Sequence, residues 1–194
     1  GIALMCPSYL PEDVATVAEY VSRFKVSSFE SMDAAFVALH AAWPEKQLII
    51  SAGMNANIAV SLHRYDTAVS PRDYVAGAIV LHCVSAYPCP SDQIGLGVLQ
   101  NWSRDSRRIG LSDHTRHPWT GGLAVAAGAE VIEFHFRLED TDPSNADYAV
   151  ARTPEEARVY VENVRTAEAI LGSGEAGVQP AEQAFMRYRV GGVA

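Results

Sequence analysis

The sequence predicts an α/β fold in which helices cover a parallel β-sheet. Short runs rich in valine, isoleucine and leucine alternate with amphipathic segments, a pattern typical of parallel strands that are buried on both faces. Strands are expected at residues 2–5, 24–28, 47–51, 78–84, 108–112 and 130–136. The length of 194 residues suits one domain with a full core. An open doubly wound sheet and part of a (β/α)8 barrel both fit, since a complete barrel takes about 250 residues.

Helix signals lie between these strands. Pro11 opens the first helix and is followed by two acidic residues at the positive end of the helix dipole. Ser31 is expected to cap a second helix, with Met32, Phe36 and Leu39 along its inner face. Further helices are expected around residues 94–102, at residues 121–129 and from Pro154 to Gly172.

Composition argues against several classes of partner. The net charge is -8 without a basic cluster, whereas binding to nucleic acid needs a patch of Lys and Arg. No apolar run approaches the roughly 18 residues of a membrane span, and the first residues lack the charged region of a signal peptide. We therefore expect a cytoplasmic protein with no membrane partner. Cys6, Cys83 and Cys89 match no metal-binding spacing and are expected to be reduced thiols.

Polar side chains follow several of the expected strands, where parallel α/β folds place their chemistry. They are Lys25, Ser27, Ser28, Glu30, Ser51, Asn55, Ser85, Tyr87, Ser112, Asp113, His114, Glu133 and His135. Taken singly, a serine there is ordinarily a turn residue, a lysine a solvated charge and a histidine a structural group. Together they indicate a site, because different strands deliver hydroxyls, a lysine and two imidazoles to one edge of the sheet.

Five segments resemble the N-acetylneuraminate (sialic acid) synthase family and occur in the family's order. They are residues 24–30 (FKVSSFE), 49–54 (IISAGM), 81–88 (LHCVSAYP), 110–115 (GLSDHT) and 131–136 (VIEFHF). Each segment alone is a weak signal, but five in order at sensible spacing make a close resemblance. The similarity covers nearly the whole chain.

The resemblance implies a (β/α)8 barrel of the TIM type, of which this chain holds six strands corresponding to the third to the eighth. Residues 1–174 then form a partial barrel domain and residues 175–194 a C-terminal linker. The family's first two strands and its small antifreeze-like domain have no counterpart here. We therefore expect unpaired sheet edges beside residues 2–5 and 130–136, and weak turnover by these residues alone.

The resemblance also implies a reaction, the condensation of phosphoenolpyruvate with an N-acetylated aldose, typically N-acetylmannosamine, with release of phosphate. A divalent metal is expected to assist, usually Mn²⁺ or else Mg²⁺, and the enzyme is expected to be a homodimer. The chemistry suits these residue types. A hard cation on two imidazoles can polarise an aldehyde, while lysine and hydroxyl donors offset the charge of a phosphate.

The resemblance assigns roles position by position. Glu30 is the expected catalytic acid/base; Lys25, Ser28, Ser51, Ser85 and Ser112 bind phosphoenolpyruvate; Tyr87 and Asp147 bind the sugar; His114 and His135 bind the metal. Asp113 and Glu133 are expected to orient the two metal-binding imidazoles, since carboxylates often do so. The remaining histidines, His40, His63, His82 and His117, are expected to take no part.

Two other functions stay open. One is a related synthase that makes another nonulosonic acid or a spore-coat sugar by the same phosphoenolpyruvate chemistry, with a different aldose. The other is a truncated homologue that binds or assembles without catalysis. Phosphate release from phosphoenolpyruvate, measured with Mn²⁺ and a panel of N-acetylated hexoses, distinguishes the three.

Overall fold

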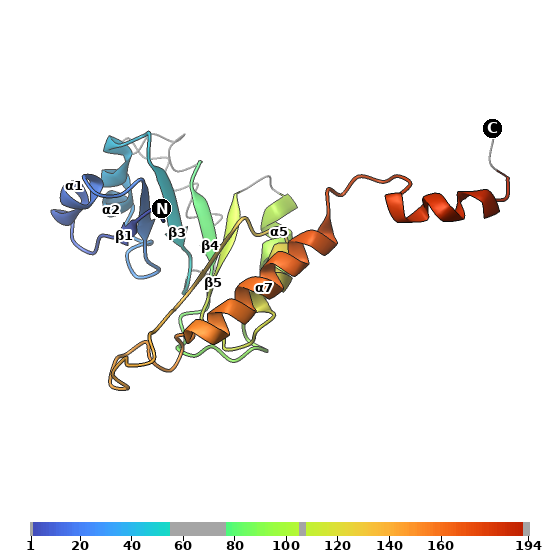
Figure 1. Ribbon diagram of the computed structural model, residues 1–194. Coiled ribbons are helices and arrows are strands. Elements are labelled where there is room, and N and C mark those ends of the chain that lie inside the picture. Colours follow the sequence, from blue (N-terminus) through green and yellow to red (C-terminus); the bar gives the residue numbers. More distant parts are fainter. Residues whose placement is uncertain (1, 55–76, 105–107, 192–194) are drawn as a thin grey trace.

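Six parallel strands form one curved sheet at the centre of the molecule (Figure 1). The computed structural model describes residues 2–54, 77–104 and 108–191, and within these ranges the strands follow one another across the sheet in chain order. They are β1 (Met5–Pro7), β2 (Arg23–Val26), β3 (Gln47–Ser51), β4 (Ile79–His82), β5 (Ile109–Asp113) and β6 (Val131–Phe134). Each strand pairs in parallel with the next, which makes the sheet a partial (β/α)8 barrel.

The strand predictions are confirmed in number and order, with the largest shift in the first strand. β3 matches its prediction at both ends, whereas β1 begins only at the last residue of the predicted strand. Ile2 and Leu4 are exposed, and pairing with β2 starts at Met5, opposite Arg23. Within the described residues β1 and β6 each pair on one side only, as expected.

Helices cover the outer side of the sheet (Figure 1). They are α1 (Asp13–Ala18), α2 (Ala34–Leu39), the 3-10 helix η1 (His40–Ala42), α5 (Gly97–Arg104), α6 (Thr120–Ala126) and α7 (Pro154–Leu171). A further 3-10 helix, η2 (Pro180–Tyr188), does not belong to this layer. Figure 1 shows η2 standing away from the sheet, and none of its residues is buried. No helix in the described part of the chain is both long and apolar enough to cross a membrane.

The start of α2 differs from its prediction. Ser31 does not cap the helix, because its hydroxyl donates to a backbone carbonyl three residues before it, at 3.0 Å. The cap is Asp33, whose carboxylate accepts from two backbone N–H groups of the first turn, each at 3.0 Å. Met32 therefore lies before the helix, whose buried residues are Phe36, Val37 and Ala38. Phe36 is buried as predicted, but Met32 and Leu39 are exposed.

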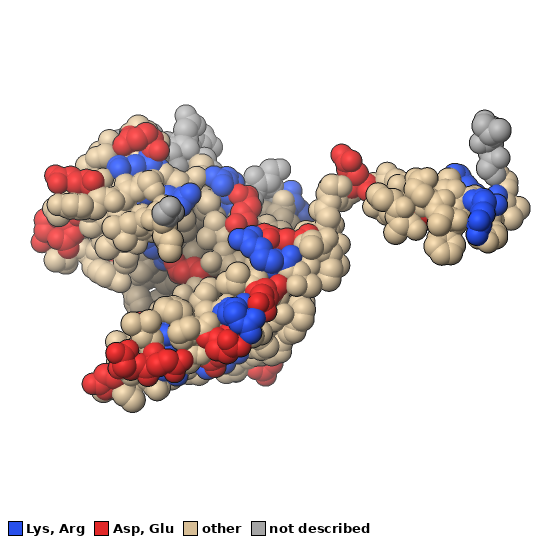
Figure 2. Space-filling model, in the orientation of Figure 1, with Lys and Arg blue, Asp and Glu red and all other residues tan. Residues whose placement is uncertain are grey.

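The last long helix, α7, begins at Pro154 and ends before Gly172, as predicted. Thr153 and Glu156 form a reciprocal capping box at its start. Acidic and basic side chains interleave along its outer surface (Figure 2) and form ion pairs, namely Arg158 with Glu155 and Glu162, and Arg165 with Glu168. Exposed pairs of this kind contribute little, so the buried face with Tyr160 holds the helix to the sheet.

The strands sort their side chains between the two faces of the sheet, since successive residues of a strand point in opposite directions. Phe24 and Leu48 point outward into a core with α1 and α2. Ile49 and Leu81 point inward and pack together inside the curve of the sheet. The inner face is therefore apolar at mid-strand, and polar residues enter it at the carboxyl ends.

His40 is fully buried in the outer core, where its pKa is lowered by desolvation. Its Nδ1 lies 3.2 Å from the carbonyl oxygen of Phe36, and its ring packs edge-on against Phe24. The unfolded chain takes up a proton near pH 6.5 while the folded protein resists it, so the free energy of unfolding should fall as the pH drops below about 6.5. Above that pH the imidazole is neutral in both states and adds no pH dependence.

Urea denaturation of the wild type and His40→Asn, at about pH 7.5 and about pH 5.5, tests this expectation. Asparagine does not titrate, so the variant should lose less stability on acidification than the wild type. Equal losses in both proteins would contradict the burial of a neutral His40.

Candidate active site

A cavity of about 630 Å³ opens at the carboxyl-terminal edge of the sheet. All the strands except β4, together with the segments that follow the strands, contribute to its wall. The wall consists of Met5, Pro7, Tyr9, Lys25, Ser27, Ser28, Phe29, Ser51, Tyr87, Ser112, His114, Glu133, His135, Ala146 and Asp147. This is the end at which parallel barrels carry their chemistry.

Strand alternation selects the polar residues of the wall. Lys25 lies between two outward-facing residues of β2, so its side chain enters the cavity. Ser51, Ser112 and Glu133 occupy inward positions near the ends of their strands. The register of β5 with β6 places Ser112 directly beside Glu133, although 21 residues separate them in the chain.

An ammonium group and hydroxyls form one side of the cavity. Lys25, only 7% exposed, donates from Nζ to Ser51 Oγ at 2.8 Å and lies 3.6 Å from Glu133 Oε1. Ser112 Oγ donates to the same carboxylate oxygen at 2.7 Å. The Ser28 hydroxyl completes this side. These convergent donors in a largely buried wall are suited to an anion.

Three aromatic rings form the other side. The ring centroids of His114 and His135 lie 5.3 Å apart, and the Tyr87 ring lies 4.2 Å from His114 and 5.5 Å from His135. His114 Nδ1 contacts the carbonyl oxygen of Val84 at 2.7 Å, and His135 Nδ1 lies 3.4 Å from an Asp147 carboxylate oxygen. These contacts fix the rotation of both imidazoles.

The donor chemistry of this side fits a divalent cation. Because Nδ1 of each imidazole faces an acceptor, Nε2 is the nitrogen that would bind a metal. Nε2 of His114 lies 3.3 Å from Ser112 Oγ, so a metal would replace that contact. Burial lowers the pKa of His114, which favours the neutral form that binds metals. Among the described residues no group of three or more His, Cys, Asp and Glu side chains could hold a metal. Two imidazoles would leave positions open for water or substrate.

Asp113 makes no hydrogen bond to either imidazole ring in the described part of the chain, contrary to its prediction. It lies between two inward-facing residues, so alternation turns its carboxylate to the helix-facing side of β5. There it pairs with Arg152 at 2.9 Å. The carboxylate beside His135 is Asp147 instead. Within the described residues, Glu133 is linked to His114 alone, through the hydroxyl of Ser112.

Glu30 and Ser85 do not line the cavity. The Glu30 carboxylate accepts a hydrogen bond from Ser27, which does line it. The Ser85 hydroxyl oxygen is buried and has no hydrogen-bond partner in the described part of the chain. Asn55 and His63 lie outside the described residues.

Tyr9 and Phe29 also line the cavity, although neither was predicted to be a site residue. Both follow a strand end closely, and both rings are largely exposed. Exposed aromatic rings at a cavity mouth suit the apolar face of a sugar. The sequence signal for these two residues is an aromatic side chain within four residues of the end of the first and of the second predicted strand.

Gly53 packs against the hydroxyl groups behind the anion side. A Cβ atom there would lie 2.7 Å from Ser28 Oγ and 2.3 Å from Ser85 Oγ. Such short side chains cannot move far, so Gly53→Ala should lower the free energy of unfolding by about 1–3 kcal/mol. It should also displace Ser28 and weaken anion binding.

Chemical denaturation and phosphoenolpyruvate titration measure the two effects of Gly53→Ala. Gly97→Ala is the matched control, because no atom of the described residues lies within 4 Å of its new Cβ, and it should be neutral or stabilising. If Gly53→Ala leaves the free energy of unfolding and anion binding as unchanged as the control does, Gly53 does not pack tightly against Ser28 and Ser85.

Known enzymes resemble this chain in sequence. A model of the NeuB family matches residues 1–176. The N,N'-diacetyllegionaminic acid synthase of Legionella pneumophila is 34% identical over 160 residues, which cover 80% of this chain and 44% of that protein. The pseudaminic acid synthase of Campylobacter jejuni is 32% identical over 182 residues, which cover 90% of this chain and 50% of that protein.

A solved structure shares the fold. The crystal structure of N-acetylneuraminic acid (sialic acid) synthetase from Leptospira borgpetersenii, in complex with citrate, matches with a TM-score of 0.81 at 26% identity and covers 94% of this chain and 63% of that chain. The matches cover between about a quarter and a half of the length of the curated relatives. The resemblance drawn from the five segments is thus confirmed, and the chain belongs to the NeuB family.

Proposed function

We propose that this chain carries the active site of a nonulosonic acid synthase, which condenses phosphoenolpyruvate with an N-acetylated aldose and releases phosphate. The observation that carries the proposal is the shared cavity, with ammonium and hydroxyl donors on one side and two imidazoles on the other. The relatives named above are synthases of acids of this class, which supports the same reaction type.

The anion side would bind phosphoenolpyruvate. Lys25, Ser28, Ser51 and Ser112 offer one charged donor and three hydroxyls to its phosphate and carboxylate groups. The Lys25 ammonium is almost fully buried, where an electrostatic contact is screened less than in water. Donors already fixed by hydrogen bonds, such as Lys25 to Ser51, need little reorganisation when the anion binds.

The reaction forms one carbon–carbon bond. The enol carbon of phosphoenolpyruvate attacks the aldehyde carbon of the aldose, and the aldehyde oxygen takes up a proton to become a hydroxyl. Water adds to the phosphate-bearing carbon and loses one proton. The bond from that carbon to the phosphate oxygen then breaks, and the remaining hydroxyl proton passes to the departing phosphate as the ketone forms. The products are the keto acid and inorganic phosphate.

Two carboxylates, Glu133 and Glu30, would be candidates to move these protons. Glu133 lies on the cavity wall between Lys25 and Ser112. Glu30 contacts the wall through Ser27. A carboxylate must lie within hydrogen-bond reach of the proton it transfers, and Glu133 meets this condition more directly.

The aromatic side would bind the aldose. A divalent cation held by His114 and His135, Mn²⁺ or Mg²⁺, would supply Lewis-acid polarisation of the aldehyde. Burial raises the pKa of Tyr87, so its phenol stays protonated at neutral pH and can donate to a sugar oxygen. Asp147 can accept from a sugar hydroxyl while it orients His135.

Lys25→Met removes the charged donor of the anion side. Loss of a buried charge-assisted hydrogen bond is worth about 1.5–3 kcal/mol, so the KM for phosphoenolpyruvate should rise by about 10- to 100-fold. A coupled phosphate-release assay on the full-length protein, with Mn²⁺ and a panel of N-acetylated hexoses, measures this and identifies the aldose. Lys46→Met is the control, since Lys46 donates to the carbonyl of Val21 and does not line the cavity.

An unchanged KM in Lys25→Met would contradict the assignment of the anion side. Phosphate release with a hexose other than N-acetylmannosamine would identify a related synthase of the same chemistry. Phosphoenolpyruvate binding without phosphate release for any hexose would favour the non-catalytic homologue.

A further inference from the structure

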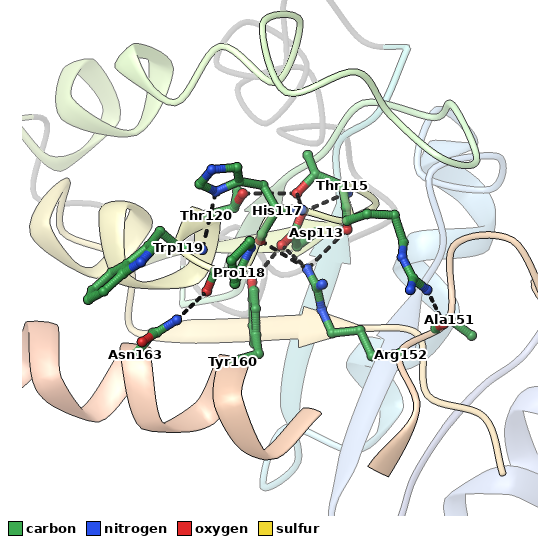
Figure 3. Close-up of polar contacts among 11 residues, drawn as sticks. Asp113, Thr115, His117, Pro118, Trp119, Thr120, Ala151, Arg152, Tyr160 and Asn163 are labelled. Carbon is green, nitrogen blue, oxygen red and sulfur yellow. Dashed lines mark hydrogen bonds and ion pairs between the residues drawn. The ribbon is translucent and has the colours of Figure 1, made fainter. Parts of the chain in front are cut away.

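A buried charged cluster lies behind the two histidines, on the helix-facing side of β5. Arg152 Nη2 donates to Asp113 Oδ2 at 2.9 Å, and the Tyr160 hydroxyl donates to the same oxygen at 2.6 Å. The side chains of Arg152 and Asp113 are only 3% and 0% exposed. Figure 3 shows Tyr160 rising from α7 and Arg152 from the segment before it, both pointing toward Asp113.

The cluster fixes the backbone on both sides of His114. The Asp113 carboxylate accepts a hydrogen bond from the backbone N–H of Thr115 at 2.8 Å. Arg152 Nη2 donates to the carbonyl oxygen of Thr115 at 3.0 Å. His114 therefore lies between two anchored residues, and its backbone position depends on the arginine.

The same arginine fixes the backbone of His135. The backbone N–H of Arg152 donates to the carbonyl oxygen of His135 at 2.8 Å, and the Arg152 carbonyl accepts from the N–H of Arg137 at 3.0 Å. These bonds form a parallel bridge between Arg152 and Phe136, just beyond β6. One residue thus holds the end of β5 by its side chain and the end of β6 by its main chain.

We propose that Arg152 is a positioning residue that sets the separation of His114 and His135 for a shared divalent cation. The proposal rests on the proposed function of the cavity. Loss of the guanidinium would free the turn that carries His114 while the main-chain contact to His135 remains. A purely structural role would change stability alone, whereas a positioning role changes metal affinity and ligand geometry in the folded protein.

Titration of the full-length protein with Co²⁺, followed by visible absorption, tests this without turnover, because the absorption reports the ligand geometry. Arg152→Met should weaken Co²⁺ binding by about 10- to 100-fold, the usual effect of removing a group that orients a metal ligand, and should change the spectrum. Binding of phosphoenolpyruvate without metal should stay close to that of the wild type. Arg158→Met is the control, because the ion pairs of Arg158 within the described residues are exposed and lie on α7, and the variant should match the wild type.

Tyr160→Phe is a milder variant that removes one hydrogen bond to Asp113 and keeps the ring 4.0 Å from the guanidinium. It should shift Co²⁺ affinity in the same direction by less, and it decides the question if circular dichroism shows Arg152→Met unfolded. If Arg152→Met is folded and keeps the wild-type Co²⁺ affinity and spectrum, the proposal is overturned. If Arg152→Met is unfolded, the same result in Tyr160→Phe overturns it.

The wild type separates failure of this proposal from failure of the proposed function. If the wild type releases phosphate and Arg152→Met binds Co²⁺ as the wild type does, the positioning role of Arg152 is wrong but the proposed function stands. A wild type that binds neither Co²⁺ nor phosphoenolpyruvate removes both proposals.

Discussion

The buried cluster around the ion pair between Asp113 and Arg152 joins strands β5 and β6 to helix α7. Two charges in a protein interior are costly unless further hydrogen bonds satisfy them. Here Tyr160 and the backbone of Thr115 supply those bonds. Removal of one charge would leave the other uncompensated, at a cost of about 3–5 kcal/mol. That is a large share of a domain's usual net stability of about 5–15 kcal/mol.

Because successive residues of a strand point to opposite faces, the same strand ends contribute to the cavity on one face and to this buried cluster on the other. Ser112 and Asp113 are neighbours in the chain but point to opposite faces of the sheet. Ser112 enters the cavity and bonds to Glu133, while Asp113 faces α7. The same period of two sends Phe134 against Tyr160 and leaves Glu133 in the cavity. The carboxyl ends of β5 and β6 therefore line the cavity on one face and contact α7 on the other.

The number and order of the strands could be predicted from the sequence, because buried parallel strands appear as continuous apolar runs. The residues that gather in the cavity could largely be predicted too, since they follow those runs. The role of Asp113 could not be predicted in the same way, because its carboxylate pairs with an arginine that is distant in the sequence. Nothing near Arg152 in the sequence marks it as buried, and its partner is 39 residues away. The cap of α2 was predicted at Ser31, but Ser and Asp are both good capping residues, and in the structure Asp33 caps the helix while Ser31 bonds to the carbonyl of Ser28.

The most direct test of this account is crystal diffraction from the protein soaked with Mn²⁺ and phosphoenolpyruvate, measured for anomalous scattering. The account predicts one anomalous peak at bonding distance from Nε2 of both His114 and His135. It also predicts the phosphate within hydrogen-bond distance of Lys25 Nζ in the same cavity. A manganese peak away from the two histidines, or phosphoenolpyruvate bound outside this cavity, would contradict it.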